Sequence, residues 1–148
     1  MGINLHAHKL LLQEVIPYLK LGIDPSVVFI GSKNVLAPGA GAAAYSVAKA
    51  GLTQLCRIAA MELAQYKIRV NIVHPNQVFD TAIWTDEVLK ARSEHYGMSV
   101  EAYKKDNLLS TDIQAADVAK TVASICSDSF SKVTGAQIAI DGGNIRTL

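Results

Sequence analysis

The chain has 148 residues, 50% of them hydrophobic and 18% charged, which indicates one folded domain and excludes an intrinsically disordered protein. Fourteen lysines and arginines against thirteen aspartates and glutamates give a net charge of +1, which predicts neither a nucleic-acid groove nor a membrane-binding patch. No apolar run is long enough to span a membrane, the first residues lack a signal-peptide pattern, and two cysteines are too few for a disulfide framework, so we expect a cytoplasmic protein.

The first half of the chain predicts a helix, a strand and a second helix. Apolar residues recur with helical spacing over residues 3–20, where Pro17 is expected to kink or end the helix and Gly22 to cap it. Ser26 to Ile30 is dominated by Val, Phe and Ile, which is typical of a strand buried on both faces of a parallel sheet. After a loop, a long helix is expected from about Ala43 to Tyr66, and its first turns hold small residues that let another helix or a ligand come close.

The second half predicts a strand, further helices and a last strand. Ile68 to Val73 is expected to form another buried strand, stopped by the His-Pro pair that follows. Two short helices are expected within 82–106. A capping-box spacing at residues 111–114 indicates the start of a helix that runs to about Ser127, and Gln137 to Ile140 is expected to be the last strand.

This order of elements predicts an α/β fold with parallel strands joined by right-handed crossovers. Three strands are few for a doubly wound sheet, and the first helix has no strand before it from which to cross over. We therefore expect the C-terminal half of a Rossmann-like doubly wound parallel sheet, with about three strands and five to six helices and with the N-terminal, nucleotide-binding half absent. On this interpretation residues 1–148 form a single partial domain.

Four polar residues are candidates for chemistry. Tyr45 and Lys49 are four apart on the long helix and share a face, where an ammonium beside a phenol favours the phenolate; a solvated helix face accounts equally well for the pair. Ser32 follows the first strand, and ligands bind at the carboxyl ends of strands in open α/β sheets, although a serine that merely ends the strand has the same place. Asn4, by itself, is an ordinary helix N-cap.

Taken together, Asn4, Ser32, Tyr45 and Lys49 resemble the catalytic tetrad of the short-chain dehydrogenase/reductase family in their order and approximate spacing. Three segments look like the family's active-site helix, its following strand and proline turn, and its last strand: 45–52, 68–75 and 134–143. The resemblance covers nearly the whole chain, and it implies a nicotinamide-dependent oxidoreductase.

The resemblance also implies a role for each member of the tetrad. Tyr45 would be the general acid/base that exchanges the proton of the substrate hydroxyl. Lys49 would favour the phenolate and hydrogen-bond the nicotinamide ribose. Ser32 would orient and polarise the substrate oxygen, and Asn4 would hold a water that links Lys49 to bulk solvent.

For the cofactor, NAD or NADP, the resemblance implies contacts from Lys49 and Tyr45 and from the stretch between Pro75 and Thr81, which includes Val78. This chain has Asn76 where the family has a glycine, and its turn is one residue longer. The glycine-rich turn and the residue that chooses between NAD and NADP belong to the half that we expect to be absent. We therefore expect this chain alone to bind the cofactor weakly and to be inactive.

A narrower resemblance concerns segments 31–39, 74–84 and 94–97, which look like the dehydrogenase part of the bifunctional rhamnulose-1-phosphate aldolase/alcohol dehydrogenases of rhamnose catabolism. It implies a small alcohol or hydroxyaldehyde, such as lactaldehyde, as the substrate. The expected substrate residues are Lys33, Asn34, Trp84 and His95. The two aromatic residues of that set fit the core of a small helical hairpin equally well.

Two functions stay open at this point. The chain is either the catalytic half of a dehydrogenase or a non-catalytic, truncated remnant whose surviving property is self-association. Family members associate through the long active-site helix, which implies a homodimer or homotetramer and a small-molecule substrate as partners.

Two other motifs carry no site. Gly39 and Gly41 formally fit a dinucleotide-binding fingerprint, but seven residues separate them from the strand, so the phosphate geometry is lost. His6 and His8 are two apart on a helix and diverge, so we expect no metal site.

Overall fold

The structure is a computed structural model that describes residues 1–145. Its helices and strands are α1 (Ala7–Leu19), β1 (Ser26–Ile30), α2 (Ala43–Leu63), β2 (Arg69–Pro75), α3 (Asp86–His95), α4 (Val100–Lys104), α5 (Ala115–Cys126) and β3 (Gln137–Ile140). This is the predicted order of elements, and the three strands and five α-helices of the described part match the predicted fold class. None of these helices is long and apolar enough to cross a membrane.

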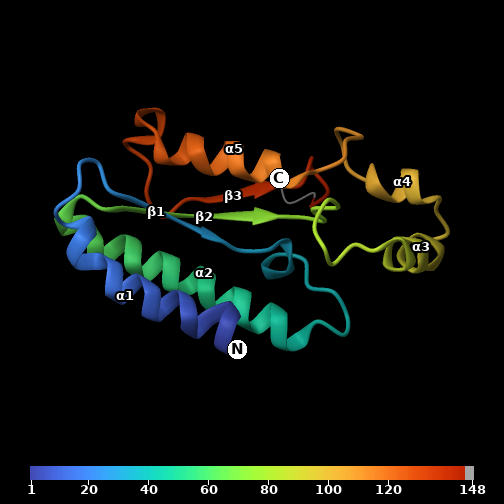
Figure 1. The fold of residues 1–148 in the computed structure, drawn as a ribbon, viewed down its shortest axis with the longest axis horizontal. Coiled ribbons are helices and arrows are strands. Elements are labelled where there is room, and N and C mark those ends of the chain that lie inside the picture. Colours follow the sequence, from blue (N-terminus) through green and yellow to red (C-terminus); the bar gives the residue numbers. More distant parts are fainter. Residues whose placement is uncertain (146–148) are drawn as a thin grey trace.

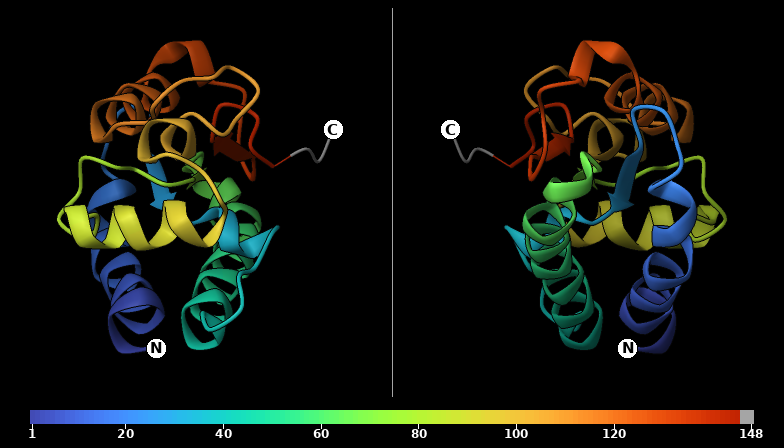
Figure 2. Two further views of the ribbon diagram at one scale, coloured as in Figure 1. Left: turned by 90° about the vertical axis from the view of Figure 1, so that its right-hand side faces the viewer. Right: turned by 90° about the vertical axis from the view of Figure 1, so that its left-hand side faces the viewer.

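The three strands form one parallel sheet in the order β1-β2-β3, as predicted. Ile30 lies beside Val73, and Val73 beside Ile138, so all three strands end at the same edge. Helices α1 and α2 cover one face of the sheet and α5 covers the other, while α3 and α4 lie beyond the carboxyl ends of the strands (Figure 1 and Figure 2). This carboxyl edge is where side chains from separate segments converge.

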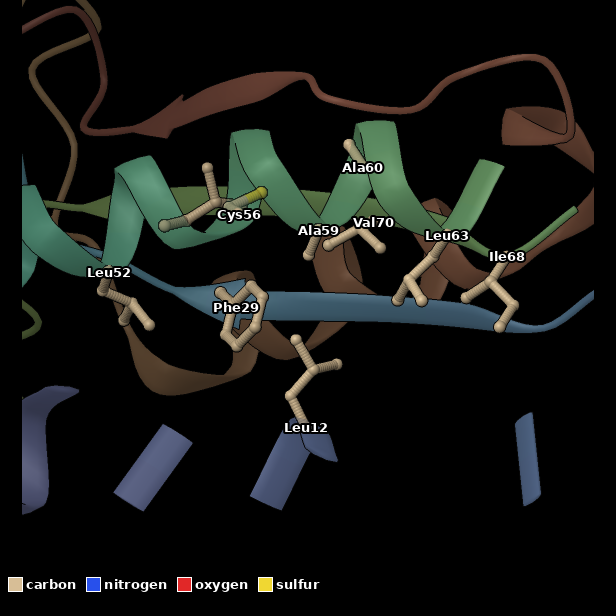
Figure 3. Packing of buried hydrophobic residues seen from close by; sticks show 10 residues of the cluster. Leu12, Phe29, Leu52, Cys56, Ala59, Ala60, Leu63, Ile68 and Val70 are labelled. Carbon is tan, nitrogen blue, oxygen red and sulfur yellow. The ribbon is translucent and has the colours of Figure 1, made fainter. Parts of the chain in front are cut away.

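The main core lies between α2 and the sheet. Leu52 and Cys56 of α2 are spaced one helical turn apart and point at the sheet, where Phe29, Val70 and Ile72 meet them (Figure 3). Small residues later in the helix let it approach the strands closely. The position of α2, and hence of Tyr45 and Lys49 on its first turns, is set by this apolar contact.

The sequence predicts that β1 and β2 are buried on both faces, and this prediction is wrong for β1. Only Phe29 of β1 is fully buried, and Ile30 is 40% exposed. In the described part of the chain β1 has a neighbour on one side only, whereas β2, between two strands and two helical layers, is buried from Arg69 to His74. β2 also continues through His74 and Pro75, because Asn76 N–H bonds to Ile140 of β3 and holds the strand end in the sheet.

Two predicted helix boundaries also differ, the end of α1 and the start of α5. Pro17 lies in the last turn of α1 and does not end it, and the turn before β1 has its left-handed residue at Asp24 (φ 47°) rather than at Gly22. The capping box of α5 is formed by Gln114 and Asp117, whose carboxylate accepts from Gln114 N–H at 3.0 Å. It is one turn later than the predicted box because the loop at 105–114 is held to other segments instead.

Candidate active site

Lys49 is held rigidly at the carboxyl edge of the sheet. Its ammonium Nζ donates to the carbonyl oxygen of Ile30 at 2.8 Å, and the side chain is 7% exposed. Nζ lies 5.8 Å from the centre of the Tyr45 ring, so the two residues share a helix face as predicted. Burial lowers the pKa of the Lys49 ammonium below its ordinary value. The Tyr45 ring is 40% exposed, which leaves the phenol open to a substrate.

Ser32 lies directly after β1, on the same strand end that Lys49 contacts. Its hydroxyl Oγ accepts from Asn34 N–H at 3.2 Å and caps the short 3₁₀ turn Lys33–Val35. Ser32 thus caps the turn that follows the strand, and this bond uses one lone pair of Oγ. The hydroxyl hydrogen is still free to donate to a substrate oxygen.

His74 is part of this edge, and it was not among the predicted site residues. The imidazole is 1% exposed, and its Nδ1 lies 3.2 Å from the backbone nitrogen and 3.1 Å from the backbone oxygen of Ser32. Burial lowers the pKa of His74 most, hydrogen bonds with Gln137 and with the Ser32 backbone raise it, and the charges of Lys49 and Arg57 lower it. The available signal in the sequence was a histidine directly before a proline, at the end of an apolar run.

Asn4 is not a helix N-cap. It lies inside the π-helical turn Gly2–His6 that precedes α1. The next residue, Leu5, packs so closely on α2 that a Cβ built at Gly51 would be 3.0 Å from Leu5 Cδ2. The turn that holds Asn4 is thus placed against α2 two residues beyond Lys49, and a small residue at that contact is what the sequence predicted.

The stretch after β2 fits a ligand with an N–H donor. The side chain of Asn76 is 4% exposed, and within residues 1–145 its Oδ1 is buried with no hydrogen-bond partner. Gln77 follows with a left-handed backbone (φ 44°), and Thr81 Oγ1 donates to the Val78 carbonyl at 2.8 Å. An unsatisfied amide oxygen at this edge suits the carboxamide N–H of a nicotinamide.

Trp84 lies two residues before α3, and His95 is the last residue of α3. Trp84 packs on Phe79 with ring centres 4.9 Å apart, and Tyr103 completes this aromatic cluster. His95 is exposed and meets Tyr96 edge-on at 5.0 Å. This packing is what the hairpin-core alternative predicts for Trp84.

The side chain of Lys33 extends toward the residues that follow β3. Its Nζ donates to Asn144 Oδ1 at 3.2 Å, while only the backbone N–H of Asn34 makes a hydrogen bond to Ser32. Burial lowers the pKa of Lys33, and the nearby carboxylates of Asp141 and Asp106 partly offset this effect. A cavity of about 430 Å³ opens beside this contact, lined by Ala37, Asp106, Asn107, Gly143, Asn144 and Ile145.

A protein-family model described as enoyl-(acyl carrier protein) reductase matches residues 1–144. The uncharacterized oxidoreductase YuxG of Bacillus subtilis is 39% identical over 123 residues, which cover 80% of this chain and 18% of that protein. Dehydrogenase/reductase SDR family member 4 of Homo sapiens is 28% identical over 146 residues, which cover 97% of this chain and 49% of that protein. The chain therefore spans half or less of the length of these relatives.

Solved structures of other proteins have the same fold. Carveol dehydrogenase from Mycobacterium avium, in complex with NAD, superimposes with a TM-score of 0.85 at 25% identity, covering 98% of this chain and 55% of that one. A short chain dehydrogenase family protein from Francisella tularensis matches with a TM-score of 0.81 at 28% identity, covering 98% and 60%. The fold and the sequence point to the same family.

Proposed function

Because the chain belongs to the short-chain dehydrogenase/reductase family, we propose that it forms the catalytic part of a nicotinamide-dependent oxidoreductase. The observation that carries the proposal is the placement of Lys49, fixed on the end of β1 and 5.8 Å from the ring of Tyr45. Ser32 follows the same strand end, so a base, a cation and a hydroxyl converge at the carboxyl edge of a parallel sheet.

In the proposed mechanism Tyr45 exchanges the proton of the substrate hydroxyl. Its exposed phenol is accessible, and the buried ammonium of Lys49 lies 5.8 Å from the centre of its ring. Ser32 donates to the substrate oxygen with its hydroxyl hydrogen, which the bond from the Asn34 N–H to Oγ does not use. Asn4 holds a water that connects Lys49 to solvent. A nicotinamide, when bound, supplies the hydride chemistry.

The residues proposed to hold NAD or NADP are Lys49 and Tyr45 together with the stretch from Pro75 to Thr81, including Val78. The unsatisfied amide oxygen of Asn76 supports a ligand at this stretch. Because the chain spans about half the length of most of its relatives, we propose that these contacts alone hold the cofactor weakly and that the isolated chain is inactive.

The proposed substrate is a small alcohol or hydroxyaldehyde, of which lactaldehyde is an example. The cavity beside Lys33 has room for a small molecule, and Asp106, Asn107 and Asn144 in its lining support a hydroxylated one. Trp84 and His95 are proposed to contact it from the α3–α4 hairpin. The match to YuxG occupies only 18% of that protein, which is compatible with a dehydrogenase part inside a longer, bifunctional chain.

A second function, self-association without catalysis, is favoured by a separate observation. An apolar groove of about 240 Å³ runs between α1 and α2, and Met61 beside it is 79% exposed. Such surfaces associate, so a dimer or tetramer is expected at micromolar concentration. Sedimentation that shows a 15.8 kDa monomer would contradict this second function.

Substitution of Tyr45 by Phe tests the catalytic proposal. In an assembly that oxidises the alcohol, Tyr45→Phe should lower the rate about 10²–10⁴-fold, because a positioned acid/base is lost. Lys49→Ala should lower both the rate and the cofactor affinity, and it should lower that affinity more than Tyr45→Phe does. Retention of more than about a tenth of the rate by Tyr45→Phe would refute the proposed role.

A further inference from the structure

We propose that His74 is a positioning residue that holds Ser32 in place, through a chain of hydrogen bonds that starts at Arg57 and passes through Gln137. The inference rests on the proposed function in one respect, the role of Ser32 at the substrate oxygen. It adds to that function a residue which the catalytic tetrad does not contain.

The imidazole of His74 links the ends of β1 and β2 to the first residue of β3. It belongs to β2, and its Nδ1 lies 3.1 Å from the carbonyl oxygen of Ser32, the second residue after β1. Its Nε2 lies 3.2 Å from the side-chain amide of Gln137 on β3. The ring is 1% exposed, so both contacts are made without competition from bulk water.

The donor and acceptor roles in this series of hydrogen bonds follow from Arg57. When the amide oxygen of Gln137 faces α2, it accepts from Arg57 Nη2 at 2.8 Å and from Nε at 3.3 Å. A guanidinium only donates, so this orientation is required, and the amide nitrogen then faces His74 Nε2 at 3.2 Å. Nε2 then accepts and the ring hydrogen lies on Nδ1, where it donates to the Ser32 carbonyl at 3.1 Å. The Ser32 N–H, 3.2 Å from the same Nδ1, bonds to the ring only in the other tautomer, so the site of the ring hydrogen decides which backbone group of Ser32 is held.

The position of the ring is set by close packing as well as by hydrogen bonds. A Cβ built at Gly31 would lie 2.5 Å from His74 Nδ1 and 2.7 Å from Cε1, so the ring lies directly on the glycine backbone. The Ser32 carbonyl also accepts from Val35 N–H at 3.2 Å. The peptide unit that orients Ser32 is therefore tied to β2 on one side and to its own 3₁₀ turn on the other.

This series of hydrogen bonds requires a neutral imidazole at His74, and the charges around the ring favour one. The charged groups that face His74 are the ammonium of Lys49 and the guanidinium of Arg57, both from α2, and both oppose a proton on the ring. Its contact on β3 is the uncharged amide of Gln137, and its contact beyond the end of β1 is the backbone of Ser32. A second proton would occupy Nε2 and break the contact with the Gln137 amide.

Two substitutions of His74 separate its two contacts. The amide nitrogen of asparagine takes the place of Nδ1, so His74→Asn keeps the bond to Ser32, whereas His74→Gln reaches only the place of Nε2. In an assembly that oxidises the alcohol, we expect His74→Gln to lower kcat on the order of 10- to 100-fold with KM for the cofactor unchanged, because Ser32 is displaced. His74→Asn should stay within about threefold of the wild-type kcat. Val70→Ala, on the same face of β2, is the control for simple core destabilisation and should leave kcat unchanged.

Nitrogen-15 NMR of the imidazoles in the 148-residue chain supplies a readout that does not depend on activity. We expect His74 to carry its hydrogen on Nδ1, and Gln137→Glu to move it to Nε2, because a carboxylate accepts from the ring. A wild-type ring protonated on Nε2 would overturn the proposal, as would equal loss of kcat in His74→Asn and His74→Gln.

Failure of the inference and failure of the proposed function give different results. If Ser32→Ala lowers kcat and His74→Gln does not, His74 does not position Ser32 and the inference is wrong. If Ser32→Ala and Tyr45→Phe both keep the wild-type rate, the proposed function is wrong whatever the variants of His74 do.

Discussion

Substitution of Gly31 by alanine should destabilise the fold through one collision. The added methyl would lie 2.5 Å from Nδ1 and 2.7 Å from Cε1 of His74, and 3.0 Å from the carbonyl oxygen of Val73. The backbone of Gly31 is not in the left-handed region, so alanine meets no conformational penalty there. The imidazole is buried and bonded at both nitrogens, which prevents it from moving aside. The cost must therefore come from overpacking.

Overpacking of a well-packed site costs about 1–3 kcal/mol of the free energy of unfolding. For a domain of this size that loss corresponds to a fall in Tm of roughly 2–12 °C. Urea unfolding followed by circular dichroism measures it directly. An unchanged midpoint in Gly31→Ala would refute the close packing of His74 on Gly31.

Two other glycines provide matched controls. A methyl at Gly39 meets nothing within 4 Å, so Gly39→Ala should change stability by less than about 0.5 kcal/mol. At Gly51 a methyl touches only the flexible end of Leu5 at 3.0 Å, and helix propensity of up to about 1 kcal/mol offsets the contact. In a His74→Ala background, Gly31→Ala should cost less than in wild type, because the colliding ring is gone.

Three further results are expected. Burial raises the pKa of the Cys56 thiol to about 11, so a thiol reagent at about pH 8 should modify the exposed Cys126 and spare Cys56 until the chain unfolds; two modified thiols in the native chain would contradict this. Burial lowers the pKa of His74 below 6.5, so the unfolded state takes up its proton first and the free energy of unfolding should fall as the pH drops below 6.5. That acid slope, measured by urea unfolding, should be smaller in His74→Asn, and an equal slope would argue against a buried, neutral ring. Calorimetry with NAD should detect no binding near a Kd of about 1 µM, and binding that tight would show that the contacts in this chain suffice for the cofactor.

The elements of the fold were predictable from the sequence alone, because their signals are local. Runs of Val, Ile and Phe marked Ser26–Ile30 and Gln137–Ile140 at their observed bounds, and the long helix was found to within its last turn. Alternation of strands and helices implied the parallel sheet, and the order of Ser32, Tyr45 and Lys49 implied the family. Each of these inferences uses residues that are close in sequence or a spacing that the chain itself displays.

The surroundings of those residues were decided only by the tertiary structure. Apolarity in β1 could not show that one side of the strand has no neighbour in the described residues, which leaves Ile30 partly exposed. His74 lies 42 residues from Ser32 and 63 from Gln137, and no local pattern joins them. Strand register brings the three together, and register is set by the packing of whole strands against α2, since hydrogen-bond partners across a parallel sheet are chosen by position in space rather than by distance along the chain.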